Sequence, residues 1–159
     1  MAIGVGDTLP DVTLTKAGPD GPEKVQTGEY FKGKTVALFS VPGAFTPTCS
    51  ARHLPGYVEK AEELRAKGVD EIVATAVNDA FVLGAWKSAN GADDVTMLAD
   101  GNGEFAEAVG LTMDGSGFGL GKRGQRYSML VEDGVVKQLN VEQPGDFSVS
   151  SAEYMLGQM

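Results

Sequence analysis

The stretch TVALFSV at residues 35–41 is a continuous run of apolar and β-forming side chains, which Pro42 and Gly43 end abruptly. Runs without polar alternation are typical of strands that are buried on both faces of a sheet. Two further runs, DEIVATAV at 70–77 and VTMLA at 95–99, have the same character. A chain with several such strands must cover both faces of one central sheet.

Segments with helical periodicity separate these strands. From about residue 49 to 67 apolar side chains recur at helical spacing, and Pro55 is predicted to kink that helix. Asn78-Asp79 is a suitable cap for a helix that extends to about residue 88, and 102–109 has the pattern of a shorter one. The alternation of strand and helix predicts parallel strands joined by helical crossovers.

The C-terminal third adds an antiparallel pair. Residues 126–132 and 135–141 have strand-like patterns and flank Asp133-Gly134, a type I′ hairpin signal. The tail from Ser151 is predicted to form a last helix. The order of elements therefore predicts an α/β fold with a mixed central sheet flanked by helices.

Length and composition fit one folded domain over residues 1–159, within which the turn-rich stretch 17–29 is interpreted as a connection. The net charge of −9 argues against nucleic acid and anionic membrane surfaces as partners. No apolar run approaches the roughly 18 residues that span a bilayer, and no secretory signal pattern is visible. One cysteine suits a reducing compartment. We expect a cytoplasmic protein, although a processed organellar protein would look the same.

Cys49 is the only cysteine of the chain, and it follows the strand at 35–41. A free cysteine is often buried packing material. At a strand-to-helix junction, however, unpaired N–H groups and the helix dipole stabilise a thiolate. Sites of α/β proteins also gather at the carboxyl ends of strands. Its position therefore favours a reactive thiol.

Three kinds of thiol chemistry can be compared with this sequence. A dithiol oxidoreductase needs Cys-x-x-Cys, but Thr46 stands three residues before Cys49. A cysteine hydrolase needs a base, and the only histidine, His53, lies one helical turn after Cys49. Its alternative role is packing or hydrogen bonding beside the pocket. Thr46 either caps the helix or hydrogen-bonds a substrate near the sulfur.

Pro42, Thr46 and Cys49 form the pattern Pro-x-x-x-Thr-x-x-Cys within VPGAFTPTCSARHLPGY. This pattern resembles the peroxidatic motif of the peroxiredoxins. The residues around it resemble those of the type-five, or type II, branch. The resemblance continues through AVNDAFVLGAWKSANG, MLADGNGEFAEAVGL and RYSMLVEDGVVKQLNVE, and covers nearly the whole chain. It implies a thioredoxin-like fold and the reduction of hydrogen peroxide and alkyl hydroperoxides.

The resemblance also implies roles for individual residues. Cys49 corresponds to the peroxidatic thiolate, Thr46 to the threonine that hydrogen-bonds the peroxide, and Pro42 to the proline that shields the thiolate from water. Arg126 corresponds to the arginine whose positive charge stabilises the thiolate and the leaving oxygen. Backbone N–H groups of Thr48 and Cys49 are candidates for holding the substrate oxygens.

The stretch KRGQR offers a second arginine, Arg123, as the competing choice. Arg126 is the first residue of the strand predicted at 126–132, whereas Arg123 belongs to the glycine-rich stretch 115–124, whose glycines at 115–121 are predicted to make a mobile surface loop. The sequence alone leaves an exposed, inactive role open for either.

The chain departs from the family pattern because it lacks a second cysteine. Some members of the branch carry a resolving cysteine in the C-terminal region, where this chain reads FSVSSAEYM. An outside thiol must therefore reduce oxidised Cys49; glutathione with glutaredoxin is favoured, and thioredoxin is the alternative. The resemblance also suggests a homodimer that meets beside the active-site loops.

A different class of function is a redox sensor or interaction protein in which oxidation of Cys49 is the signal. Scattered acids with one cysteine and one histidine give no metal-ligand spacing, and no phosphate-binding glycine loop joins a strand to a helix. We predict no metal and no cofactor.

Overall fold

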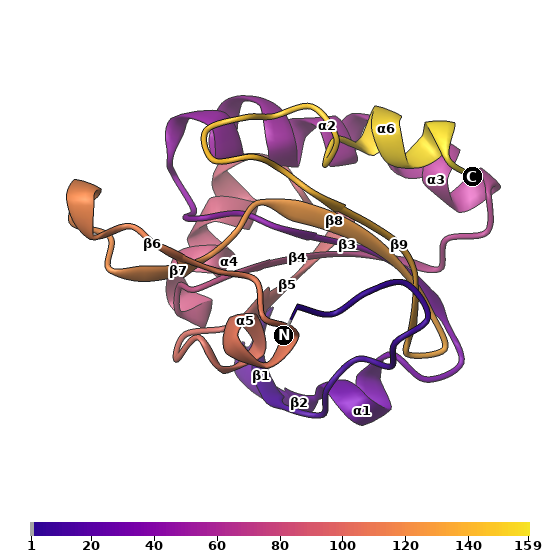
Figure 1. The fold of residues 1–159 in the computed structure, drawn as a ribbon, viewed down its shortest axis with the longest axis horizontal. Coiled ribbons are helices and arrows are strands. Elements are labelled where there is room, and N and C mark those ends of the chain that lie inside the picture. Colours follow the sequence, from indigo (N-terminus) through magenta and orange to yellow (C-terminus); the bar gives the residue numbers. More distant parts are fainter. Residues whose placement is uncertain (1) are drawn as a thin grey trace.

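The computed structural model describes residues 2–159, and its centre is a seven-stranded mixed sheet in the order β2-β1-β5-β4-β3-β8-β9 (Figure 1). The strands are β1 (Thr13–Gly18), β2 (Gly21–Gln26), β3 (Thr35–Ser40), β4 (Glu71–Ala76), β5 (Val95–Ala99), β8 (Tyr127–Glu132) and β9 (Val135–Val141). The three apolar runs form the parallel centre β3–β4–β5. β8 pairs antiparallel with β3, and β1 pairs antiparallel with β5.

Helices cover the sheet on both faces (Figure 1). Side chains of α2 (Leu54–Glu59), α3 (Ala61–Ala66), α4 (Ala80–Ala89) and α6 (Ala152–Gly157) join one apolar core. Side chains of α5 (Glu104–Val109) join the second core, on the other face. So does Phe31, the residue that caps the end of α1 (Thr27–Tyr30). The prediction of a mixed sheet flanked by helices is confirmed.

Capping and turn residues in the sequence correctly predicted several elements. The Asp79 side chain caps α4 by accepting from the Val82 N–H at 2.8 Å, and Ser151 caps α6 by accepting from the Tyr154 N–H at 3.1 Å. Asp133 and Gly134 have φ of 49° and 79°. Positive φ at both positions is what a type I′ hairpin requires, because this turn matches the twist of the paired strands.

One expectation was wrong. Residues 17–29 are not a plain connection, since they contribute to the β1–β2 hairpin at the edge of the sheet. Most of β2 is exposed, so it carries no apolar alternation by which to recognise it. Pro55 lies in the first turn of α2, and the π-helical turn Cys49–His53 directly precedes it, so the helix expected over 49–67 is irregular beside the proline. A second break comes at Lys60, between α2 and α3.

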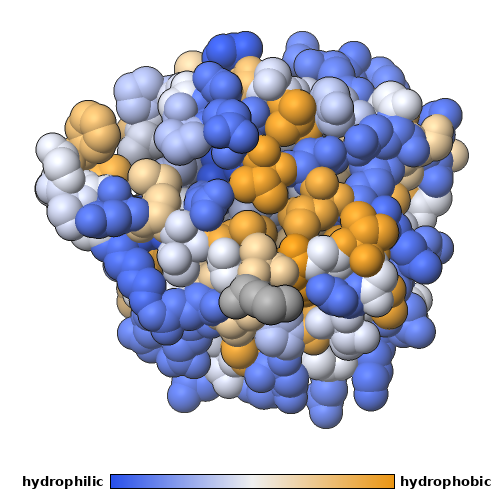
Figure 2. Space-filling view, viewed as in Figure 1, coloured by the Kyte–Doolittle hydropathy of each residue, from blue (hydrophilic) through white to orange (hydrophobic). Residues whose placement is uncertain are grey.

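The glycine-rich stretch 115–124 is part of a projecting arm (Figure 1). Its two sides, β6 (Thr112–Asp114) and β7 (Lys122–Gly124), pair antiparallel, and Ser116–Phe118 forms a 3-10 turn near the tip. Figure 2 shows hydrophobic side chains gathered at the centre of the same face of the molecule, surrounded by hydrophilic ones. Within residues 2–159, no helix is long and apolar enough to cross a membrane.

Candidate active site

Cys49 lies just beyond the carboxyl end of β3, and its side chain is completely buried. The helix starts at residue 47 and continues as a π-helical turn, Cys49–His53. Its first backbone bond is from the Ser50 N–H to the Thr46 carbonyl, at 2.9 Å. The N–H groups of Thr48 and Cys49 therefore precede the intrahelical ladder. π-Helical turns often mark functional sites.

Arg126 is the positive charge at the sulfur. Its Nη2 donates to Cys49 Sγ at 2.9 Å. The antiparallel register sets Ser40 opposite Tyr127, so Arg126, one residue earlier, emerges at the end of β3 where Cys49 also lies. Because a guanidinium always carries its charge, this contact places a permanent positive charge beside the sulfur.

Arg123 has a different position. Its Nε donates to the Leu120 carbonyl at 2.9 Å, and its Nη1 donates to the Pro42 carbonyl at 3.3 Å. It therefore ties the projecting arm to the loop before Cys49. The two arginines are three residues apart in sequence, and Arg126 is the one that the fold brings to the sulfur.

His53 contacts Arg126 on the side away from the sulfur. Its Nδ1 is 2.9 Å from Arg126 Nη1, and its Nε2 is 3.0 Å from the Ser150 carbonyl. A guanidinium has only donors, so Nδ1 accepts and Nε2 carries the proton. Burial, assisted by the charge of Arg126, lowers the pKa of His53 to about 3. Its lone pair is thus occupied, and the geometry does not provide the Cys–His pair that a hydrolase needs.

Thr46 and Pro42 belong to the loop that joins β3 to the helix. The Thr46 hydroxyl donates to the Gly43 carbonyl at 2.7 Å, which leaves its oxygen lone pairs able to accept. Its backbone carbonyl, not its side chain, takes part in starting the helix. The loop is tight: a Cβ at Gly43 would lie 3.2 Å from both Arg123 Nη1 and Thr46 Cγ2, and Phe45 has a φ of 64°.

A cavity of about 540 Å³ opens beside these residues. We call it the Arg126 cavity; it is lined by Pro42, Thr48, Thr112, Met113, Asp114, Phe118, Gln125, Arg126, Glu142, Gln143, Pro144, Gly145 and Asp146. Arg126 both lines the cavity and contacts the buried sulfur of Cys49. The cavity combines apolar walls from the projecting arm with a fixed positive charge.

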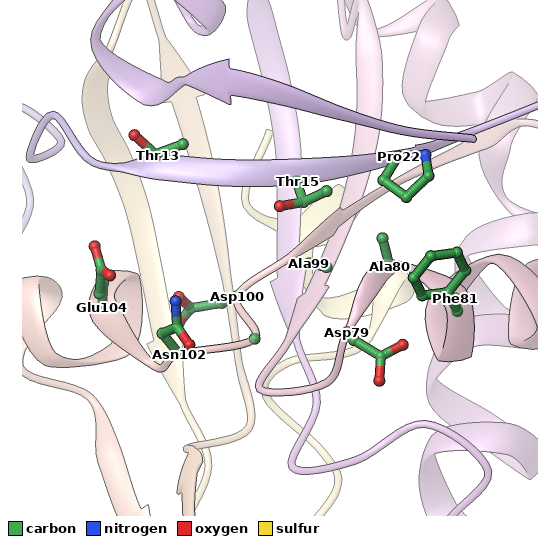
Figure 3. A pocket seen from close by; sticks show the side chains of 11 residues that line it. Thr13, Thr15, Pro22, Asp79, Ala80, Phe81, Ala99, Asp100, Asn102 and Glu104 are labelled. Carbon is green, nitrogen blue, oxygen red and sulfur yellow. The ribbon is translucent and has the colours of Figure 1, made fainter. Parts of the chain in front are cut away.

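A second cavity, of about 240 Å³, lies beyond the carboxyl end of β5 (Figure 3). We call it the Asp100 cavity; its lining includes Asp79, Phe81, Asp100 and Glu104. Asp100 accepts from the N–H groups of Phe105 and Ala106 at 3.0 and 2.9 Å. Asp79 likewise caps α4, so two carboxylates of the Asp100 cavity bond the N–H groups at the starts of helices. No three His, Cys, Asp or Glu side chains among residues 2–159 are grouped to hold a metal ion.

Comparison with known proteins identifies the family. The Redoxin family model matches residues 4–156. The chain belongs to the peroxiredoxins. It is 55% identical to peroxiredoxin-2E-2, chloroplastic, of Oryza sativa subsp. japonica, over 97% of this chain and 71% of that one. A relative this similar, over nearly all of the chain, makes it a peroxiredoxin thiol peroxidase.

Solved structures agree with that assignment. A reduced Prx3 of Vibrio vulnificus, crystallised in complex with H2O2, is 52% identical and superposes with a TM-score of 0.95 over 98% of both chains. Peroxiredoxin 5 of Alvinella pompejana is 33% identical, with a TM-score of 0.83 over 97% of this chain and 96% of that one. The fold is therefore thioredoxin-like, and the relatives include the type II, or type-five, branch.

Sequence reasoning missed three residues behind the site: Tyr57, Glu142 and Ser150. Tyr57 donates to the Ser150 carbonyl at 3.0 Å, beside His53, and Glu142 accepts from the Ser150 N–H at 2.7 Å. Ser150 contributes mainly backbone groups, which no side-chain pattern reveals. Glu142 follows β9 directly, and only its burial marks it as unusual.

Proposed function

We propose that Cys49, Thr46, Arg126 and Pro42 form the peroxidatic site. The Cys49 thiolate attacks the terminal oxygen of a hydroperoxide, ROOH. A sulfur–oxygen bond forms while the O–O bond breaks, and the electron pair leaves with the second oxygen. That oxygen takes up a proton to give ROH, or water from hydrogen peroxide, and Cys49 becomes a sulfenic acid.

The 2.9 Å contact between Arg126 Nη2 and Cys49 Sγ carries this proposal. It holds a permanent positive charge where the attacking sulfur and the departing oxygen both bear negative charge. The free lone pairs of Thr46 can accept a hydrogen bond from the peroxide O–H, and the N–H groups of Thr48 and Cys49 can donate to the peroxide oxygens. Pro42 lines the cavity and limits the access of water.

The proposed substrates are hydrogen peroxide and alkyl hydroperoxides. Hydrogen peroxide needs only the polar end of the Arg126 cavity. A volume of about 540 Å³ exceeds what that molecule fills, and Met113, Phe118 and Pro144 add apolar lining. Apolar walls of this kind favour an organic group attached to the peroxide.

The proposed reductant is glutathione with glutaredoxin, in preference to thioredoxin. These 159 residues contain no second cysteine with which the sulfenic acid can form an intrachain disulfide. A glutathione thiolate attacks the sulfenic sulfur, and hydroxide leaves as water on protonation. The thiolate of glutaredoxin then attacks the glutathione sulfur of this mixed disulfide, forms its own disulfide with glutathione and releases the Cys49 thiolate.

We further propose a cytoplasmic homodimer. Phe45, in the loop between β3 and Cys49, is 55% exposed, so a second copy that covers it would meet the first beside the active-site loops. The single cysteine suits a reducing compartment.

The test is steady-state consumption of hydrogen peroxide, with the glutathione–glutaredoxin and thioredoxin systems supplied separately. We expect catalytic turnover that depends on Cys49 and is faster with glutaredoxin. Faster turnover with thioredoxin would reject the reductant preference alone. Oxidation that stops after one equivalent of peroxide with every reductant would instead favour the redox sensor. The dimer is tested by sedimentation of the protein and of Phe45→Ser.

A further inference from the structure

Glu142 is a buried carboxylate on the wall of the Arg126 cavity, and only 6% of its surface is exposed. Its Oε2 accepts from the Ser148 N–H at 2.7 Å, the Ser150 N–H at 2.7 Å and the Ser150 hydroxyl at 2.6 Å. Burial raises the pKa of Glu142, but these hydrogen bonds outweigh it and bring the pKa below its ordinary value. The side chain is therefore held as a charged, multiply bonded anchor.

The anchor is linked to the sulfur by an unbroken series of hydrogen bonds. Ser150, fixed by Glu142, accepts at its carbonyl from His53 Nε2 at 3.0 Å. His53 Nδ1 accepts from Arg126 Nη1 at 2.9 Å. The other terminal nitrogen of the same guanidinium, Nη2, donates to Cys49 Sγ at 2.9 Å.

A second link runs through the backbone. The Glu142 N–H donates to the Arg126 carbonyl at 3.0 Å, which continues the pairing of β8 with β9 by one step. Glu142 thus fixes both ends of Arg126: the main chain directly, and the guanidinium through Ser150 and His53. The ring of His53 cannot turn easily, because Phe39, Tyr57 and Phe147 pack around it with ring centroids 4.8, 5.7 and 5.1 Å away.

We propose that Glu142 is a positioning residue for catalysis, which sets the guanidinium of Arg126 against the Cys49 sulfur through Ser150 and His53. This inference rests on the proposed role of Arg126. An arginine side chain has many rotamers, and a small displacement of a catalytic group costs much of its effect on rate. A fixed carboxylate at the end of the series limits that displacement without touching the substrate.

A purely structural role for Glu142 has a different signature. If it only holds the segment between β9 and α6, its loss lowers stability and affects the rate equally whether or not Arg126 is present. If it acts through Arg126, its effect on rate disappears once Arg126 is removed, because the two residues share one path. A double-mutant cycle on the rate therefore separates the two roles.

The experiment measures the rate at which hydrogen peroxide adds one oxygen to the reduced protein, by rapid quenching and intact mass. The variants are Glu142→Gln, Arg126→Ala and the double substitution. Glu153→Gln is the matched control, since it removes an exposed carboxylate from the same C-terminal segment. We expect Glu142→Gln to slow oxidation about tenfold, less than the about 10²–10³-fold of losing a direct donor, with no further slowing in the Arg126→Ala background.

Glu142→Gln with a rate within twofold of the parent would overturn the proposal, and so would an equal loss in both backgrounds. If Glu142→Gln does not fold, Ser150→Ala is used instead, because it removes only the 2.6 Å bond from the Ser150 hydroxyl to Glu142. In the same double-mutant cycle we expect Ser150→Ala to slow oxidation less than Glu142→Gln, and only when Arg126 is present. A parent protein that reacts no faster with peroxide than free cysteine would reject the proposed peroxidatic site itself. A reactive parent with an unaffected Glu142→Gln rejects only the positioning role.

Discussion

The two cavities have similar surroundings but differ in what their polar groups do. Both lie at the carboxyl ends of strands beside the start of a helix, the position where α/β proteins commonly bind ligands. In the Asp100 cavity, whose lining side chains Figure 3 shows, the carboxylates of Asp79 and Asp100 accept from backbone N–H groups. Beside the Arg126 cavity, the guanidinium that lines it contacts the buried thiol of Cys49, and the Thr46 hydroxyl keeps free lone pairs. Chemistry is expected where the polar groups still have capacity to bond.

Cys49→Ser tests this comparison most severely. Serine is similar in shape but is a poor nucleophile at neutral pH, so peroxidase activity is expected to disappear while the fold remains intact. Peroxide consumption and circular dichroism, measured on the same sample, check both parts. Retention of more than a few per cent of the rate would remove Cys49 from the mechanism.

Arg126→Ala should give the next largest effect, because it removes the donor at the sulfur. Loss of one preorganised donor typically costs about 10²–10³ in rate. Arg123→Ala is the matched control, since Arg123 bonds backbone carbonyls of the neighbouring loops. The rate of oxidation by hydrogen peroxide is the measurement, and a greater loss in Arg123→Ala would reverse the assignment of the two arginines.

His53, which contacts Arg126, is expected to make the free energy of unfolding depend on pH. Its pKa is about 3 in the fold but near 6.5 when unfolded, so between these values the unfolded chain binds a proton that the folded chain does not. The free energy of unfolding therefore falls as pH decreases through this window, with a slope of up to about 1.4 kcal/mol per pH unit from this group. His53→Gln should lack that component.

Urea unfolding of the parent and of His53→Gln, at several values between about pH 4 and about pH 8, measures the difference. The stability of the variant relative to the parent should improve as the pH falls below about 6.5 and should be constant above it. A constant difference across the whole range would show that His53 titrates normally in the fold.

How far the sequence predicted this site depends on the distance of each contact along the chain. Cys49 and Thr46 share one short motif, whereas Arg126 was assigned only through the family resemblance, because the β3–β8 register that brings it to them is not visible in the sequence. The contacts of His53 with Arg126 and Ser150 span 73 and 97 residues, and one of them uses a backbone carbonyl. No local pattern encodes such a partner.

The missed elements have the same kind of cause. The β1–β2 hairpin lies at the sheet edge, where exposed side chains leave no alternation to detect. The segment with helical periodicity from about residue 49 to 67 is divided into a π-helical turn, α2 and α3. The spacing of its apolar residues does not reveal these divisions.

Phe118→Ala tests the apolar wall of the Arg126 cavity. Phe118 lines the cavity from the projecting arm and is 85% exposed, so a bound organic group can cover its ring. We expect KM for cumene hydroperoxide to rise about three- to tenfold, with little change for hydrogen peroxide. Phe81→Ala is the control, because Phe81 lines the Asp100 cavity and is 75% exposed. Equal effects of the two substitutions would mean that the cavities do not differ in substrate contact.

Asp79→Ala has the smallest expected effect and addresses the Asp100 cavity. The Asp79 carboxylate accepts from the Val82 N–H at the start of α4, and loss of such a cap costs about 1 kcal/mol. Asp79→Asn should retain most of that stability, because an amide oxygen caps a helix almost as well. Urea midpoints of the three proteins check this order, and their peroxidase rates should agree within twofold. A large loss of rate in Asp79→Ala at unchanged stability would show that the Asp100 cavity takes part in the chemistry after all, since a cap acts only through the helix that it begins.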